Sequence, residues 1–307
     1  MSDGWTRRGM LSGGLGALLA SAASRARSPA RRSRLILLGT KGEPTPSRAR
    51  APAANLLIVD GEPFVIDCPD GVARQLVLAG IDLATLRNLF LTHLHSDHVA
   101  GLGALLLIAW GSGLQRPVAA YGPPPLARSL QLAIEANAPD IEARTREEGR
   151  PALAPLVSAR ELIAGGTIFE TERVRVRCAP VDHYTIPSLA YRFDAPDRSF
   201  VFSGDTRPSD ALIALARGAD VLVHEAMLVE AIGDLRDGNA PDLRSHLLRS
   251  HSTTEEVGRV AAAAGVGTLV LSHLVPADPA ITDAMWIAGV RRHYRGRIIV
   301  GRDLMEI

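Results

Sequence analysis

Three histidines and one aspartate lie within six residues, directly after an apolar run. The run at 86–92 has the composition of a buried strand, and it is followed directly by the motif His93-Leu-His95-Ser-Asp97-His98. Imidazole nitrogens with one carboxylate oxygen on a single loop form a donor set that zinc prefers. The following run, at 99–110, has a helix's length and composition, so Ser96 or Asp97 could cap it. A strand, a ligand loop and a helix in this order favour an α/β fold with a metal site.

The plain alternative is that these are polar residues drawn to the start of a helix. That explanation would fit one histidine, but it does not account for three histidines and an aspartate. The rest of the composition suits a globular protein with a sizeable core, because 47% of the 307 residues are hydrophobic and 22% are charged. The formal net charge of +1 provides no overall attraction for nucleic acid. A nucleic-acid surface would therefore have to be local.

The N-terminal segment has the order of a cleavable twin-arginine signal peptide. Arg7-Arg8 precede a weakly apolar run at 11–23, and small residues follow it. The run is too short to span a bilayer, so we expect no transmembrane segment. We expect a signal peptide at 1–26, a basic linker at 27–34, a folded domain at 35–307, and a periplasmic or secreted location. A disordered N-terminal tail is the alternative.

Candidate site residues also follow predicted strands in the second half of the chain. Thr253 and Glu256 have the spacing of a capping box, which would fix the backbone just after a histidine at 251. In the first half, Asp67 ends a strand and is either a partner for a metal-bound histidine or a turn cap. The candidates in the second half are His183, Asp205, Glu225, His251 and His273.

Loops at 40–54, 137–160 and 234–250 are expected to be irregular and to form the walls of the pocket that binds the substrate. In the first of these, turn-forming residues are frequent. The cysteines Cys68 and Cys178 are too few for a disulfide scaffold and are not spaced as a metal pair. We expect buried core thiols, with a single disulfide bridge between them as the alternative.

The order and context of seven residues resemble the metal ligands of the metallo-β-lactamase superfamily, over residues 35–307. The resemblance implies an αββα sandwich with a binuclear site, usually of two Zn²⁺, at one edge of the sheets. One metal would be held by His93, His95 and His183. The other would be held by Asp97, His98 and His273, with Asp205 bridging the two. A bridging hydroxide would be the nucleophile, oriented by Asp97.

Three further phrases resemble the branch of ribonuclease Z and the zinc-dependent arylsulfatases. They are Ser203-Gly-Asp-Thr206, His224-Glu-Ala226 and His251-Ser-Thr253. The resemblance implies that His251 protonates the leaving group and that Glu225 orients it, and an imidazole suits such a role. The alternative for His251 is a solvent-exposed residue of the capping loop.

The expected substrate depends on the spacing between His183 and Asp205. Ribonuclease Z cuts the 3′ end of precursor tRNA and grips the tRNA with a long arm inserted between these positions, which here are only 22 residues apart. We therefore expect an exported binuclear zinc hydrolase of small-molecule sulfate esters or phosphodiesters, without a nucleic-acid partner. A ribonuclease Z-type tRNA 3′ endonuclease and a lactonase are the alternatives, ahead of a β-lactamase or a non-catalytic metal-binding protein. The oligomeric state is open, and a homodimer is one alternative.

Overall fold

The computed structural model describes residues 32–233 and 241–307. Within these ranges, fourteen strands form two sheets of seven. The strands of the first sheet are β1 (Ser33–Gly39), β2 (Ala54–Val59), β3 (Glu62–Ile66), β4 (Asn88–Phe90), β5 (Val118–Gly122), β6 (Val157–Glu161) and β14 (Met305–Glu306). Those of the second are β7 (Gly166–Glu170), β8 (Arg175–Val181), β9 (Ser188–Asp194), β10 (Ser199–Phe202), β11 (Val221–Met227), β12 (Thr268–Val275) and β13 (Arg297–Val300).

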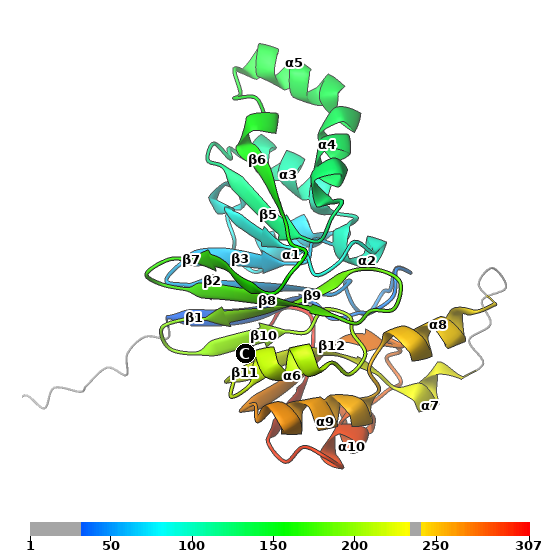
Figure 1. Ribbon diagram of the computed structural model, residues 1–307. Coiled ribbons are helices and arrows are strands. Elements are labelled where there is room, and N and C mark those ends of the chain that lie inside the picture. Colours follow the sequence, from blue (N-terminus) through cyan, green and yellow to red (C-terminus); the bar gives the residue numbers. More distant parts are fainter. Residues whose placement is uncertain (1–31, 234–240) are drawn as a thin grey trace, which may run out of the picture. The chain divides into compact units, whose positions relative to one another are not determined.

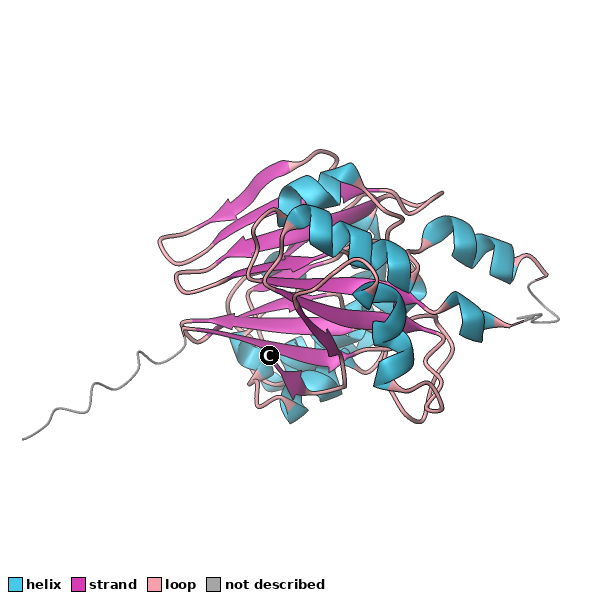
Figure 2. Ribbon diagram, turned by 90° about the horizontal axis from the view of Figure 1, so that it is seen from below, coloured by secondary structure: helices cyan, strands magenta, loops and turns pink. Residues whose placement is uncertain are grey.

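Helices lie on the outer face of each sheet, as Figures 1 and 2 show. Those connected with the first sheet are α1 (Val72–Leu78), α2 (Ser96–Val99), α3 (Leu102–Gly111), α4 (Leu126–Ala136) and α5 (Ala138–Glu148). Those connected with the second are α6 (Asp210–Ala216), α7 (Val229–Ile232), α8 (Leu243–Ser250), α9 (Thr254–Ala264) and α10 (Asp283–Arg291). The layers are therefore helix, sheet, sheet, helix, which confirms the predicted αββα sandwich.

The strand order brings the ends of parallel strands to one edge of the sandwich. It is β14-β1-β2-β3-β4-β5-β6 in the first sheet and β13-β12-β11-β10-β9-β8-β7 in the second. Strands β3 to β6 run parallel to one another, and so do β10 to β13. Loops that leave the carboxyl ends of parallel strands meet outside the sheet, where α/β proteins place their binding sites.

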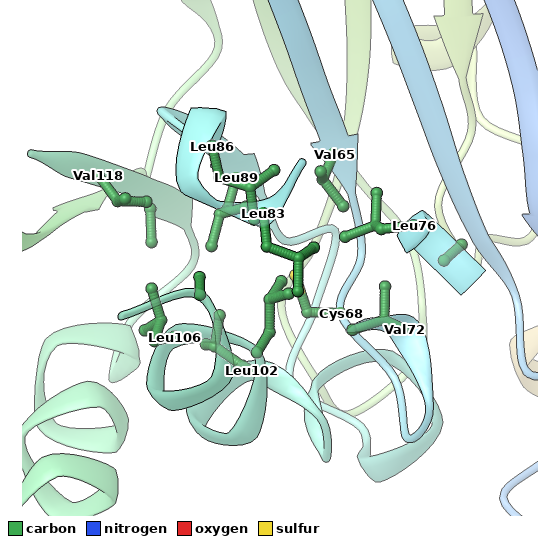
Figure 3. Packing of buried hydrophobic residues seen from close by; sticks show 14 of the residues in the cluster. Val65, Cys68, Val72, Leu76, Leu83, Leu86, Leu89, Leu102, Leu106 and Val118 are labelled. Carbon is green, nitrogen blue, oxygen red and sulfur yellow. The ribbon is translucent and has the colours of Figure 1, made fainter. Parts of the chain in front are cut away.

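Three hydrophobic clusters hold the layers together. Between the sheets, the rings of Phe90 and Phe193 lie 5.1 Å apart at 79°, an edge-to-face contact across the interface. A second cluster packs α1, α3 and α4 onto the first sheet, and Figure 3 shows its branched side chains around Leu83 and Leu102. A third packs α6, α9 and α10 onto the second sheet. Each large side chain buried in this way contributes roughly 1.5–3 kcal/mol, so the sheets form a rigid base for the loops.

Several local predictions are confirmed. Asp60 and Gly61 join β2 and β3 with φ of 48° and 84°, as a tight hairpin turn requires. Thr253 and Glu256 form the predicted capping box of α9. Cys68 and the cysteine at 178 are free and buried in separate clusters, so they are core thiols and the alternative of a bridge is wrong.

Other local predictions are wrong or lie outside the described part. The segments expected to be irregular at 137–160 and 234–250 contain the helices α5 and α8. The predicted signal peptide at 1–26 and the linker up to 31 lie outside the described residues and stay predictions. Strand β1 begins at Ser33, so the last two residues of the predicted linker belong to the first sheet. Within the described ranges, no helix has the length and apolarity needed to cross a membrane.

Candidate active site

All seven predicted metal ligands come together at the edge where the parallel strands end. The loop after β4 supplies His93 and His95, and Asp97 and His98 lie in the short helix α2 that follows. The second sheet supplies the others from loops after β8 and β10 and from within β12. Their donor atoms form overlapping groups within 4.8 Å of one another. The structure therefore places at one edge the seven residues that the resemblance implied as ligands.

One group consists of three imidazoles. His95 Nδ1 lies 3.1 Å from His93 Nε2 and 3.2 Å from His183 Nε2. Two nitrogens on a tetrahedral zinc ion, each about 2.0–2.1 Å from the metal, are about 3.3 Å apart. The spacing of these nitrogens therefore fits a single zinc ion.

A second group contains Asp97, His98 and His273. Asp97 Oδ2 lies 3.5 Å from His273 Nε2 and 3.8 Å from His98 Nε2. The Nε2 atoms of both histidines are buried without a hydrogen-bond partner. Because a buried polar atom without a partner is costly, these nitrogens fit a cation as their missing partner.

Asp205 stands between the two groups. Its Oδ2 lies 3.2 Å from His273 Nε2 and 3.7 Å from His93 Nε2, so one carboxylate reaches a member of each set. Gly204 directs it there with φ of 60°, and a Cβ on this glycine would lie 2.7 Å from the carbonyl oxygen of Leu189. Only glycine suits such a turn, and the geometry fits the predicted bridging position.

Outer hydrogen bonds orient two of the ligands. His98 Nδ1 donates to Asp67 Oδ2 at 2.8 Å, and the backbone N–H of Thr92 donates to Asp67 Oδ1 at 2.7 Å. His183 Nδ1 donates to the carbonyl oxygen of Ser250 at 2.9 Å. A proton on Nδ1 leaves the Nε2 lone pair of each ring free for a metal. Asp67 is therefore the partner of His98, one of the predicted ligands, which fits the first of its two predicted roles.

His251 and Glu225 form a buried pair beside these ligands. His251 Nδ1 donates to Glu225 Oε2 at 3.0 Å, and the backbone N–H of Thr206 donates to Glu225 Oε1 at 2.7 Å. Only 6% of His251 is exposed, so the alternative of a solvent-exposed capping residue is wrong. Burial lowers the pKa of His251, but the Glu225 carboxylate more than offsets this and raises it to about 9. The ring therefore holds a proton at neutral pH.

A pocket of about 460 Å³ opens over these groups. Two of the three expected loops supply its walls, and the segment at 137–160 supplies none of its lining residues. Sequence reasoning missed His246, which lines the pocket from α8. Leu243 lies three residues before His246, one helical turn away, and this spacing is the signal that could have found it. The lining outside the metal ligands and His251 is Glu43, Pro44, Thr45, Ser96, Leu243, His246 and Leu247.

A second missed feature is the buried lysine after β1. Lys41 Nζ donates to the carbonyl oxygens of Gly42 and Glu43, at 2.6 Å and 2.9 Å. A Cβ on Gly42 would lie 2.7 Å from the His273 ring. The lysine therefore keeps this loop closed against a metal ligand, and no motif in the sequence indicates it.

Comparison with known proteins agrees with this arrangement. Residues 63–274 match the β-lactamase superfamily domain. The chain is 35% identical over 277 residues to ribonuclease Z of Mycobacterium avium (strain 104), covering 89% of this chain and 97% of the relative. The chain belongs to the ribonuclease Z family of the β-lactamase superfamily. Membership of this family supports hydrolase activity.

Solved structures show the same fold at lower identity. Human tRNase Z, short form, is 22% identical with a TM-score of 0.65, covering 89% of this chain and 98% of the human chain. The metallo-β-lactamase fold protein YhfI from Bacillus subtilis is 18% identical with a TM-score of 0.66, covering 90% and 98%. At these identities the likeness concerns the fold alone.

The expectation of a small-molecule ester hydrolase without a nucleic-acid partner is wrong. It rested on the missing arm between His183 and Asp205. The alignment with the mycobacterial relative is 277 residues long and covers 89% of the 307 residues of this chain, which is about 273. Because these two lengths nearly agree, the relative has no long insertion in the aligned region, and it is still named ribonuclease Z. A short connection at this point therefore does not separate the chain from ribonuclease Z. These relatives also give no support to the arylsulfatase part of the predicted branch.

Proposed function

We propose that this chain is a metal-dependent endoribonuclease that removes the 3′ trailer from precursor tRNA. The observation that carries the proposal is similarity to a protein named ribonuclease Z over 97% of that protein's length. The geometry of the site supports it, because the ligands, the buried acid and the pocket suit hydrolysis of a phosphodiester.

Two Zn²⁺ ions are the cofactors we propose. His93, His95 and His183 would hold one ion. Asp97, His98 and His273 would hold the other, with Asp205 shared. When bound, zinc makes a coordinated water acidic enough to lose its proton near pH 7 and neutralises charge on a phosphate oxygen.

His251 acts as the general acid in this proposal. A tRNA needs a free 3′ hydroxyl to be aminoacylated, so the bond that breaks joins phosphorus to the 3′ oxygen. A ribose oxygen leaves poorly as an anion, and a positioned imidazolium that supplies a proton accelerates such a step by about 10²–10⁴-fold. Glu225 holds Nδ1 of His251 at 3.0 Å, so Nε2 is the atom that donates. The products are a tRNA ending in a 3′ hydroxyl and a trailer with a 5′ phosphate.

Asp97 has a second role in the proposal besides metal binding. Its carboxylate lines the pocket, and the pKa of Asp97 lies well below its ordinary value, because the nearby imidazoles of His273 and His98 outweigh the effect of burial. An ionised carboxylate accepts hydrogen bonds only. Asp97 therefore orients the attacking water by accepting a hydrogen bond from it.

Cleavage of a precursor tRNA tests the proposal directly. The purified zinc-loaded chain is expected to release the trailer from a transcript labelled at its 5′ end, and His251→Ala is expected to lose this activity with its metal content unchanged. His293→Ala is the matched control, because His293 contacts Arg259 on an exposed surface. An intact transcript after incubation with the wild-type chain would refute the proposal.

Export remains a separate proposal. The predicted twin-arginine signal directs a folded chain out of the cytoplasm, whereas precursor tRNA is made inside it. Fusing residues 1–30 to a reporter, with and without Arg7→Lys and Arg8→Lys, decides between these locations. Export that depends on both arginines is expected, and cytoplasmic retention of the unchanged fusion would refute it.

A further inference from the structure

An exposed tyrosine stands at the rim of the site, next to a metal ligand. Tyr184 directly follows His183, and 52% of it is exposed. Its φ of 58° is one that bulky residues rarely adopt. Asp182 stabilises this conformation, because its Oδ1 accepts the Tyr184 backbone N–H at 3.1 Å while its carboxylate pairs with Arg207. The fold therefore holds a large aromatic ring outward beside the catalytic groups.

Basic and aromatic neighbours from α8 surround this ring. The guanidinium of Arg249 lies 5.1 Å from the centre of the Tyr184 ring, a cation–π contact. The ring of His246 stands edge-on to Tyr184, with centroids 6.5 Å apart, and His246 itself lines the pocket. An aromatic ring beside an arginine is the combination with which proteins bind single-stranded nucleic acid, since bases stack on the ring and cations attract the phosphates.

Tyr184, His246 and Arg249 lie on the side of the site where the leaving 3′ oxygen is expected. The rings of His183 and His251 lie 5.1 Å apart, and α8, which carries His246 and Arg249, ends at the residue before His251. In the proposed reaction His251 protonates the leaving 3′ oxygen. The nucleotide that carries this oxygen must therefore lie on the same side as Tyr184.

We infer that Tyr184 is the stacking platform for the base of the last tRNA nucleotide, the one whose 3′ oxygen leaves. Arg249 supports the ring and attracts the phosphate on the 5′ side of that nucleotide. This inference rests on the proposed function. It assigns to the rim a contact with the tRNA side of the cleaved bond.

The experiment compares two precursor tRNAs, one natural and one with an abasic residue at the last tRNA nucleotide. With the natural substrate, Tyr184→Ala is expected to lower kcat/KM about tenfold, within the range that base stacking on an aromatic ring provides. Tyr184→Phe keeps the ring and is expected to restore cleavage. With the abasic substrate, Tyr184→Ala is expected to cause no further loss, because the base it would contact is absent.

A second readout does not depend on the rate of cleavage. With 2-aminopurine at the same nucleotide, mixing with the wild type or Tyr184→Phe is expected to quench its fluorescence before the bond is cut, and Tyr184→Ala is not. Equal cleavage of the natural substrate by wild type and Tyr184→Ala, an equal loss with both substrates, or equal quenching would overturn the inference. If the wild-type chain leaves the natural transcript intact, the proposed function fails instead.

Discussion

The metal ligands and the rim of the pocket differ in how the fold holds them. His93, His98, His183, Asp205 and His273 are at most 5% exposed and lie at one edge of the sandwich, where the two sheets and outer hydrogen bonds fix them. The rim consists of the loop that contains Glu43, the short helix α8 and the half-exposed Tyr184. In the proposed reaction the buried ligands would determine the chemistry for any substrate, whereas the rim would contact the RNA. Substitutions can sharpen or break this distinction.

The largest effect is expected from Asp205→Ala. Its Oδ2 lies within 4 Å of nitrogens in both ligand groups, so its loss should reduce the bound zinc below two per chain. The metals would stabilise the transition state by several kcal/mol, so losing them should lower the rate of RNA cleavage by roughly 10³-fold or more. Zinc analysis and RNA cleavage check both statements. A variant that retains two zinc ions would contradict the bridging role.

His251→Ala should lower RNA cleavage by about 10²–10⁴-fold while leaving metal content unchanged. The loss should shrink with bis(4-nitrophenyl) phosphate, because 4-nitrophenolate leaves without needing a proton. Rates on the two substrates measure the difference. Equal losses would mean that His251 acts in another way.

Asp67→Asn tests whether the hydrogen bond from His98 to Asp67 supports metal binding, although Asp67 is not itself a proposed ligand. Asp67 accepts from His98 Nδ1 at 2.8 Å, and losing such a partner typically weakens metal binding about 10–100-fold. Competition with a chelator measures zinc affinity, and Asp70→Asn, on the exposed turn nearby, is the control. Unchanged affinity would show that packing alone holds the ring of His98.

Glu225→Gln should move the pH dependence of cleavage. His251 donates its proton below its pKa, which Glu225 raises, so activity falls as the pH rises through that value. Without the carboxylate the burial of the ring lowers the pKa of His251, and the alkaline limb of the kcat profile should move to lower pH by about one unit or more. Profiles that superimpose would contradict this pairing.

The smallest effect is expected at the rim. Glu43 lines the pocket and its carboxylate lies 3.8 Å from Lys41 Nζ. Removing this negative charge in Glu43→Gln should lower KM for RNA about two- to fivefold at low salt, because phosphates are no longer repelled. Measurements at two salt concentrations should show the gain vanish as screening increases. A gain that salt does not affect would point to a change in shape instead.

The buried ligands could be predicted from the sequence because their chemistry is local. His93 to His98 present their donors from one loop, and the Ser-Gly-Asp-Thr phrase contains the glycine that turns Asp205 inward. The sandwich likewise follows from strands that end in polar residues. The pair of His251 and Glu225 was predicted by resemblance, and the structure supplied its contact.

The rim could not be predicted in the same way. Glu43, Tyr184 and His246 acquire their positions only when distant segments pack together, and each is an ordinary surface residue by type. The helix α8 was missed because its polar residues and short length hide its apolar face. The substrate was predicted wrongly because the length of one connection was taken as decisive, although a mycobacterial ribonuclease Z also lacks a long insertion there.

The main chains of the two halves join beside His273. Lys41 forms a bridge with Leu274, and the backbone N–H of Leu274 donates to the carbonyl oxygen of Thr40 at 2.9 Å. Neither half contains a full set of the proposed ligands, so we expect tight metal binding from the assembled chain only. A ligand at 1,000 times its Kd stabilises a folded protein by about 4 kcal/mol. Zinc supply would thus govern how long each molecule survives proteolysis in the cell, as well as how fast it works.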